Sequence, residues 1–134
     1  DLPRQIGPFR IERRLGYGGM AEVFLAVANG ASGFEKRVAL KTLLPAFQGD
    51  PVYERLLIDE AVRAARFQHR NLVQVHDLGC SDGRYWVRMD WVDGTDLATL
   101  QARAPLPRPE ALFVLEEIAL ALHPLRLAPG LVEW

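Results

Sequence analysis

Three glycines and one lysine are the residues that are most suited, by type and spacing, to binding phosphate. Gly16, Gly18 and Gly19 stand just before the β-forming run 22–27, and Lys41 closes a second such run. Glycine lets phosphate oxygens approach the backbone closely, because no Cβ obstructs the contact and left-handed φ values cost it little. A lysine ammonium binds a phosphate pair as a compact point charge. The pattern therefore indicates a glycine-rich phosphate cover and a phosphate-holding lysine.

The segment after the glycines distinguishes two kinds of phosphate site. A glycine cluster that opens a helix is typical of dinucleotide-binding folds. Residues 22–27 instead carry no helix cap and no 3.6-residue stripe, so we expect a hairpin of strand, glycine turn and strand. An ordinary glycine-rich hairpin without a ligand is the alternative, since glycine is a default residue of tight turns.

Lys41 is one of only two lysines among sixteen basic residues. Strand alternation puts it on one face with Ala39 and Leu43, while Val38 and Leu40 take the other face. An ammonium on such an apolar strand needs a partner, because unpaired burial of a charge is costly. The alternative is a lysine at the strand edge whose ammonium reaches water.

The partner is expected on the next helix. Asp50 and Pro51 form a helix start, and the helical pattern runs to about residue 67. Its predicted apolar stripe comprises Leu56, Leu57, Ala61, Ala64 and Phe67. Glu60 lies inside that stripe, so we expect its carboxylate to pair with Lys41. The alternative is a glutamate at the edge of the stripe that reaches water.

In order and spacing, these motifs resemble the N-terminal lobe of protein kinases, particularly the bacterial eukaryotic-like Ser/Thr kinases. The likeness is carried by Gly16-x-Gly18-Gly19-x-Ala21-x-Val23, by Val38-Ala39-Leu40-Lys41 and by Glu60, and it continues through residues 64–75 and 84–97. It implies an α+β fold, with a five-stranded antiparallel sheet plus one helix in residues 9–92. Two helices of an incomplete large lobe follow in residues 93–134. Ala21 replaces the usual third glycine, and Arg70 stands where the family often has proline.

The resemblance implies an ATP site beneath the glycine loop. Leu15 and Val23 are expected to sandwich the adenine, with Ala39 beside them. Gly16, Gly18 and Gly19 are expected to cover the phosphates. Lys41 is expected to hold the α- and β-phosphates while paired with Glu60.

The resemblance also assigns the hinge. Met89 matches the gatekeeper at the back of the adenine pocket, and the backbone from Asp90 to Val92 is expected to offer a donor and an acceptor to the purine. Asp96 matches the acidic position that contacts the ribose. A plain core role for Met89 and a plain helix-cap role for Asp96 are the alternatives.

In the family, a segment like Gly130-Leu131-Val132 leads into a catalytic loop, with an Asp-Phe-Gly segment further on. The sequence printed here ends at Trp134 with neither, so we expect the chain by itself to lack the catalytic base and the protein ligands of Mg²⁺ and to be inactive. Three hypotheses stand: the ATP-binding part of a Ser/Thr kinase acting on protein hydroxyls, an inactive pseudokinase or nucleotide-binding regulatory module, and a degraded or interaction module without ATP. The joint presence of Gly18, Lys41 and Glu60 argues against the third.

Composition narrows the partners. The 134 residues are 49% hydrophobic with a net charge of −1, which suits one soluble unit and gives no electrostatic case for nucleic acid or a membrane surface. Cys80 is the only cysteine, which suits a reducing cytosol, so we expect a cytoplasmic protein. His69, His76 and His123 lack metal-ligand spacing, so no metal site is expected.

Two helices are expected after the hinge, over residues 97–103 and 109–122. The second carries an apolar stripe formed by Leu112, Leu115, Ile118, Ala119 and Leu122. The resemblance implies that the rest of the large lobe covers this stripe in a complete kinase. We therefore expect the chain alone to expose apolar surface and to self-associate or fold poorly beyond the hinge.

Overall fold

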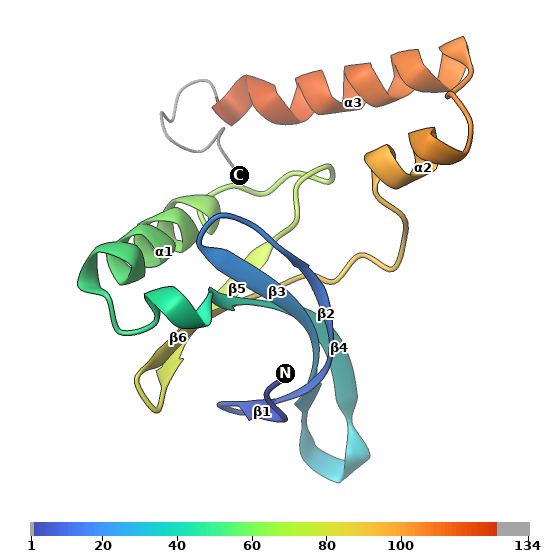
Figure 1. The fold of residues 1–134 in the computed structure, drawn as a ribbon. Coiled ribbons are helices and arrows are strands. Elements are labelled where there is room, and N and C mark those ends of the chain that lie inside the picture. Colours follow the sequence, from blue (N-terminus) through green and yellow to red (C-terminus); the bar gives the residue numbers. More distant parts are fainter. Residues whose placement is uncertain (1, 126–134) are drawn as a thin grey trace. The chain divides into compact units, whose positions relative to one another are not determined.

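A computed structural model of the chain describes residues 2–125, and the segment 130–134 that is expected to lead toward a catalytic loop lies outside them. The chain divides into two compact units. One unit comprises Asp1–Gln68 and Val73–Trp91, and the other comprises His69–Leu72 and Val92–Trp134. The first is a sheet with one helix, and the second is helical (Figure 1).

The sheet unit is built on a six-stranded antiparallel sheet. In sheet order the strands are β1 (Gln5–Ile6), β2 (Phe9–Tyr17), β3 (Ala21–Asn29), β4 (Glu35–Leu43), β6 (Arg84–Met89) and β5 (Val75–Ser81). Five of them match the five predicted strands, and β1 adds a two-residue strand at the edge. The α+β fold class is confirmed.

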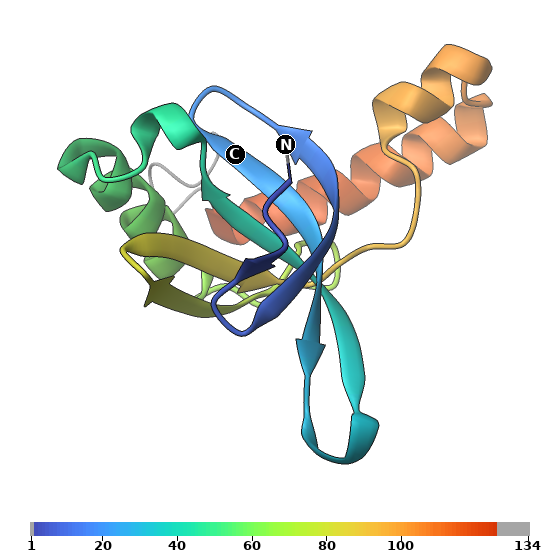
Figure 2. The same cartoon turned by 60° about the horizontal axis from the view of Figure 1, so that its bottom comes forward.

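The hairpin turns follow local chemistry. Asp82 and Gly83 join β5 to β6 with φ values of 52° and 76°, a pair of left-handed residues that matches the twist of the flanking strands. A short 3-10 turn, Ala31–Gly33, joins β3 to β4. The far ends of these two strands project away from the rest of the sheet (Figure 2).

Both faces of the sheet are covered, which explains the continuous apolar run in β4. One face buries a cluster of Ile6, Phe9, Phe24, Ala26, Val38, Leu40 and Trp86. The opposite face packs under helix α1 (Pro51–Ala64) through Leu43, Leu57, Ala61, Ala64, Val75 and Val87. Strand alternation puts successive β4 residues on opposite faces, as predicted for Val38 and Leu40 against Leu43.

Helix α1 begins with the predicted cap. The Asp50 carboxylate accepts a hydrogen bond of 2.9 Å from the Val52 N–H, and Pro51 occupies the first helical position. The predicted stripe is wrong at two positions. Leu56 is 49% exposed, because its neighbour Leu57 takes the face toward the sheet, and Phe67 lies beyond the helix, which ends at Ala64.

A charged group is buried on the sheet face away from α1. Glu22 is only 2% exposed and forms an ion pair of 3.1 Å with Arg14 on the neighbouring strand. Arg84 donates a hydrogen bond of 3.3 Å to the Thr42 hydroxyl. Burial lowers the pKa of the Arg84 guanidinium, and the nearby Glu22 carboxylate opposes that change. Glu22 is therefore tolerated inside the sheet because cations lie beside it.

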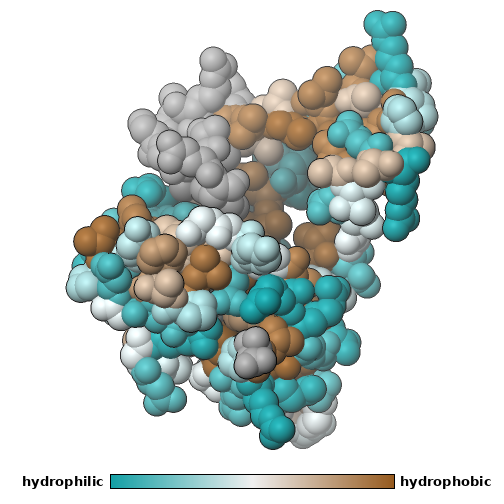
Figure 3. All heavy atoms as spheres, in the orientation of Figure 1, coloured by the Kyte–Doolittle hydropathy of each residue, from teal (hydrophilic) through white to brown (hydrophobic). Residues whose placement is uncertain are grey.

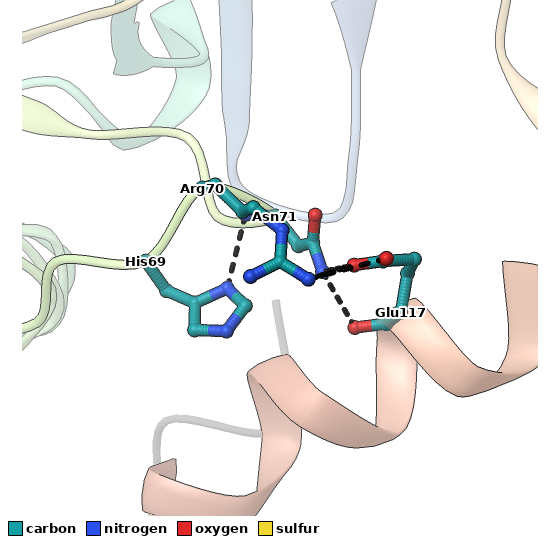
Figure 4. A network of polar contacts seen from close by, with 4 residues as sticks. All are labelled: His69, Arg70, Asn71 and Glu117. Carbon is teal, nitrogen blue, oxygen red and sulfur yellow. Dashed lines mark hydrogen bonds and ion pairs between the residues drawn. The ribbon is translucent and has the colours of Figure 1, made fainter.

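The helical unit contains α2 (Leu97–Arg103), which has its predicted bounds, and α3 (Arg108–Leu125). The loop His69–Leu72 belongs to this unit through a polar network (Figure 4). Arg70 forms an ion pair of 2.9 Å with Glu117 on α3, and the Asn71 amide donates to the Glu117 backbone carbonyl at 2.8 Å. The side-chain hydrogen bond from Asn71, followed by that from Arg70, lowers the pKa of Glu117. The resembled family often has proline at this position. Proline has no side-chain donor and could not make this contact.

Hydrophobic side chains lie exposed along α3 (Figure 3). Leu112, Leu115, Ile118 and Leu122 of the predicted stripe are all exposed, with Leu115 at 61%. A shallow pocket of about 490 Å³ lies between α3 and the loop of the same unit, with a largely apolar lining that includes Leu72. Within residues 2–125, no helix is long and apolar enough to cross a membrane.

We expect Arg14→Gln to lower the free energy of unfolding by about 2 kcal/mol, because the buried Glu22 carboxylate would lose its ion pair. Thermal unfolding followed by circular dichroism measures this loss. Arg13→Gln is the matched control, since Arg13 is an exposed residue of the same strand, and it should change stability by less than about 0.5 kcal/mol. Equal melting temperatures for the two variants would contradict a stabilising role for the pair.

Candidate functional site

The glycine-rich segment forms the predicted hairpin. Gly16 lies in β2 opposite Val23 of β3, and residues 18–20 connect the two strands. The Gly18 N–H donates to the Ala21 carbonyl at 2.8 Å, which closes the turn. A second bond of 2.8 Å, from the Leu44 N–H to the Met20 carbonyl, ties the connection to the end of β4.

The structure changes the explanation of why glycine stands at these three positions. None of Gly16, Gly18 and Gly19 has a positive φ, so left-handed backbone does not explain them. A Cβ built at each of the three would meet no atom within 4 Å. The backbone therefore faces open space on the side where a side chain would stand, as close approach of a ligand to the backbone requires.

Strand register brings four predicted site residues together on the face that α1 covers. Val23 lies opposite Lys41, which in turn lies opposite Val87 on β6. Ala39, two residues from Lys41, lies opposite Met89. Residues directly opposite each other point to the same side of a sheet, so Val23, Ala39, Lys41 and Met89 form one surface.

Lys41 and Glu60 meet directly. The Lys41 Nζ lies 2.6 Å from Glu60 Oε1, and the two side chains are 20% and 23% exposed. Each charge compensates the other in a region that is partly removed from water. Because both side chains keep some exposure, the pair is not fully sealed from solvent.

The predicted hinge residues follow the end of β6. Met89 is half-buried and packs against the α1 side of the sheet. The Asp90 N–H donates to the Gln74 carbonyl at 3.0 Å, and the Val92 carbonyl accepts from the Gly94 N–H at 3.0 Å. Within the part of the chain that the structure describes, the Asp90 carbonyl oxygen and the Val92 N–H have no hydrogen-bond partner.

Asp96 caps a helix. Its carboxylate accepts a hydrogen bond of 2.6 Å from the Thr99 N–H at the start of α2, and its hydrogen bonding with Thr99 lowers the pKa of Asp96. Asp96 therefore has the helix-cap role that was the alternative for this residue. Its contact with a ribose stays a prediction. Val92 and Asp96 belong to the helical unit, whereas the other predicted site residues, Leu15 included, belong to the sheet unit.

Sequence reasoning missed the contact between His76 and Asp90. The His76 Nε2 lies 2.5 Å from Asp90 Oδ1, and both residues are exposed. Residue spacing gives no reason to single out His76. Among the side chains that the structure describes, no group of three or more His, Cys, Asp or Glu residues is arranged to hold a metal. A histidine fourteen residues before an aspartate carries no signal until the strand pairing is known.

Bacterial kinases are among the known proteins similar to this chain. The chain is 39% identical over 127 residues to the tyrosine-protein kinase MasK of Myxococcus xanthus (strain DK1622), covering 91% of this chain and 20% of that protein. It is 37% identical over 119 residues to the serine/threonine-protein kinase PknE of Mycobacterium tuberculosis (strain ATCC 25618 / H37Rv), covering 88% of this chain and 20% of that protein. No protein-family model matches. The chain spans about a fifth of the length of these relatives.

The fold gives the same answer. A crystal structure of the PknI kinase domain of Mycobacterium tuberculosis matches with a TM-score of 0.67 and 36% identity, covering 91% of this chain and 50% of that domain. Fold and sequence together define the N-terminal part of a protein kinase domain. The chain belongs to the protein kinase family and is related to bacterial serine/threonine and tyrosine kinases.

Lys41→Met should lower the free energy of unfolding by about 1–2 kcal/mol, because it leaves the partly buried Glu60 carboxylate without its cation. Chemical denaturation measures the change. Lys36→Met is the matched control, since Lys36 is the only other lysine, lies on the same strand and is exposed. It should change stability by less than about 0.5 kcal/mol.

Glu60→Gln and the double variant complete the cycle. If the contact is stabilising, the two substitutions should be non-additive by about 0.5 kcal/mol or more. Strict additivity would show that the two side chains do not interact in solution.

Proposed function

We propose that this chain is the ATP-binding part of a Ser/Thr protein kinase. The observation that carries the proposal is the 2.6 Å contact between Lys41 and Glu60 on the sheet face that also carries Val23, Ala39 and Met89. In phosphoryl-transfer enzymes of this family, a lysine on a strand and a glutamate on the following helix must be paired for the phosphates to be held. The sequence relatives, which are serine/threonine and tyrosine kinases, support the same class.

The phosphate end of ATP would lie under the glycine hairpin. Phosphate oxygens could approach the backbone closely at Gly16, Gly18 and Gly19, because no side chain intervenes and the Cβ positions face open space. The Lys41 ammonium would hold the α- and β-phosphates, and Glu60 would keep it oriented. This division explains why a partly exposed ion pair suits the site better than a fully buried one.

The adenine end would use apolar contacts and two backbone groups. Leu15, Val23, Ala39 and Met89 supply the apolar surface. The Asp90 carbonyl oxygen and the Val92 N–H, which have no partner among the described residues, would offer an acceptor and a donor to the purine edge. An apolar pocket with a few fixed polar groups is the usual form of a small-molecule site.

The reaction we propose for the whole protein is transfer of the ATP γ-phosphoryl group to Ser or Thr hydroxyls of proteins. The residues of this chain contribute binding and orientation, which make up much of phosphoryl-transfer catalysis. Magnesium neutralises phosphate charge in such reactions, but the described residues include no cluster suited to hold it, so no magnesium ligand is assigned here. Residues 9–92 would form the small lobe, and residues 93–134 the hinge and the start of the large lobe.

The exposed side chains of α3 suggest a protein partner for the helical unit. We propose that further parts of a kinase domain cover this surface, since the chain corresponds to 50% of the PknI kinase domain. Without that cover, self-association through the apolar side chains of α3 is expected, because such exposed surface favours burial.

ATP with magnesium chloride should raise the melting temperature of the chain, because a ligand that binds only the folded state stabilises it. Lys41→Met should remove the rise, and Lys36→Met should retain it. Differential scanning fluorimetry over a range of ATP concentrations makes the measurement. Absence of a rise in the parent chain would overturn the proposed ATP site.

Gly18→Ala should separate ligand binding from folding. Stability should stay equal or rise by up to about 1 kcal/mol, because the φ at Gly18 is compatible with alanine and the added Cβ meets no atom within 4 Å. ATP affinity should fall, because the methyl group obstructs the approach of the phosphates. Gly83→Ala is the control, because its φ of 76° strains alanine: it should lower stability and leave ATP affinity unchanged. Unchanged ATP affinity in Gly18→Ala would argue against a phosphate cover.

A further inference from the structure

An irregularity in strand pairing sits beside the proposed hinge. On β5, Val75 lies opposite Met89 and Asp77 lies opposite Arg88, so His76 is an extra residue without a partner in the ladder. Such a bulge bends the strand and redirects a side chain, and bulges occur often next to functional sites. Here the redirected side chain is the imidazole that contacts Asp90.

Gln74, just before β5, and His76, in β5, both hold Asp90. Its carboxylate lies 2.5 Å from the His76 Nε2, and its backbone N–H donates to the Gln74 carbonyl at 3.0 Å. The hydrogen bond from His76 is the main cause that lowers the pKa of Asp90, and the charge of Lys36 contributes a smaller effect in the same direction. Both bonds fix the first residue after β6, where the chain leaves the sheet.

An exposed pair of this kind usually contributes little to stability. The position of the His76–Asp90 pair points to a role other than stability. The carbonyl oxygen of Asp90 is the proposed acceptor for the purine, so restraint of Asp90 from its side chain and its N–H limits the positions that this oxygen can take. A preorganised acceptor binds its ligand with a smaller loss of conformational entropy.

We propose that His76 is a positioning residue of the nucleotide site: through the bulge in β5 and its hydrogen bond to Asp90, it holds the hinge backbone ready for the adenine of ATP. This inference rests on the proposed ATP site and adds to it a residue outside the site itself. His76 does not touch the ligand. It acts through Asp90.

The test compares three variants of this chain and two ligands by isothermal titration calorimetry. His76→Phe removes the hydrogen bond, and His76→Gln retains an amide donor in its place. Asp77→Asn is the control, because it removes a different exposed ion pair of β5, the 3.1 Å contact between Asp77 and Arg88. The ligands are ATP and inorganic tripolyphosphate, which offers the phosphates without the adenine.

His76→Phe should weaken ATP binding about three- to ten-fold, the effect of one net hydrogen bond, and should leave tripolyphosphate affinity within two-fold. His76→Gln should recover most of the ATP affinity, and Asp77→Asn should match the parent chain. If the parent chain binds ATP and His76→Phe binds it equally well, the inference is wrong and the ATP site stands. An equal loss for both ligands would also overturn it, because a general structural defect affects both.

A second measurement does not depend on nucleotide binding. Amide hydrogen exchange followed by NMR should show faster exchange at the Asp90 N–H in His76→Phe than in the parent chain or in Asp77→Asn, because the restraint from the side chain is lost. Unchanged exchange at Asp90 would overturn the positioning role. If the parent chain bound no ATP, the proposed function would fail, and the exchange result would still decide whether His76 restrains the hinge.

Discussion

The contact between Lys41 and Glu60 is the interaction on which the candidate site depends. An ammonium on an apolar strand is unfavourable unless a carboxylate meets it, and α1 supplies that carboxylate only if it packs on the same face of the sheet. The packing of Leu57, Ala61 and Ala64 therefore does more than bury apolar surface. It places Glu60 at the lysine and so links the core to the site.

Other charges in the molecule follow the same rule. Glu22 lies inside the sheet beside Arg14 and near Arg84, and Glu117 on α3 joins Arg70 and the Asn71 amide. In each case an acidic group on one element accepts from basic or polar groups on another segment of the same unit. Single ion pairs at exposed positions contribute little to the free energy of unfolding. Those that join segments distant in sequence help to fix how these segments are oriented, which apolar contacts alone specify only loosely. The loop at Arg70 joins the helical unit in this way.

The segment after β6 shows how a break in a strand ladder redirects a side chain. A regular β5 would pair each residue with β6, whereas the bulge at His76 leaves one residue out of the ladder and directs it to Asp90. The glycines of the hairpin likewise need no unusual backbone geometry. Their φ values are ordinary, so the open backbone at Gly16, Gly18 and Gly19, not unusual backbone geometry, is what they supply.

The order of the motifs along the chain indicated the kinase family. The sequence by itself also determined local features: the glycine hairpin, the Asp50 cap, the alternation in β4 and the need of Lys41 for a partner. These follow from neighbouring residues, whose effects on backbone and burial are short-range. Only the tertiary structure decided the rest. Whether Leu56 or Leu57 faces the sheet depends on the rotation of α1, the contact of His76 with Asp90 depends on a shift of strand register, and the contact of Arg70 with Glu117 joins residues far apart in the chain. Such outcomes depend on long-range packing, which no local pattern of residue types encodes.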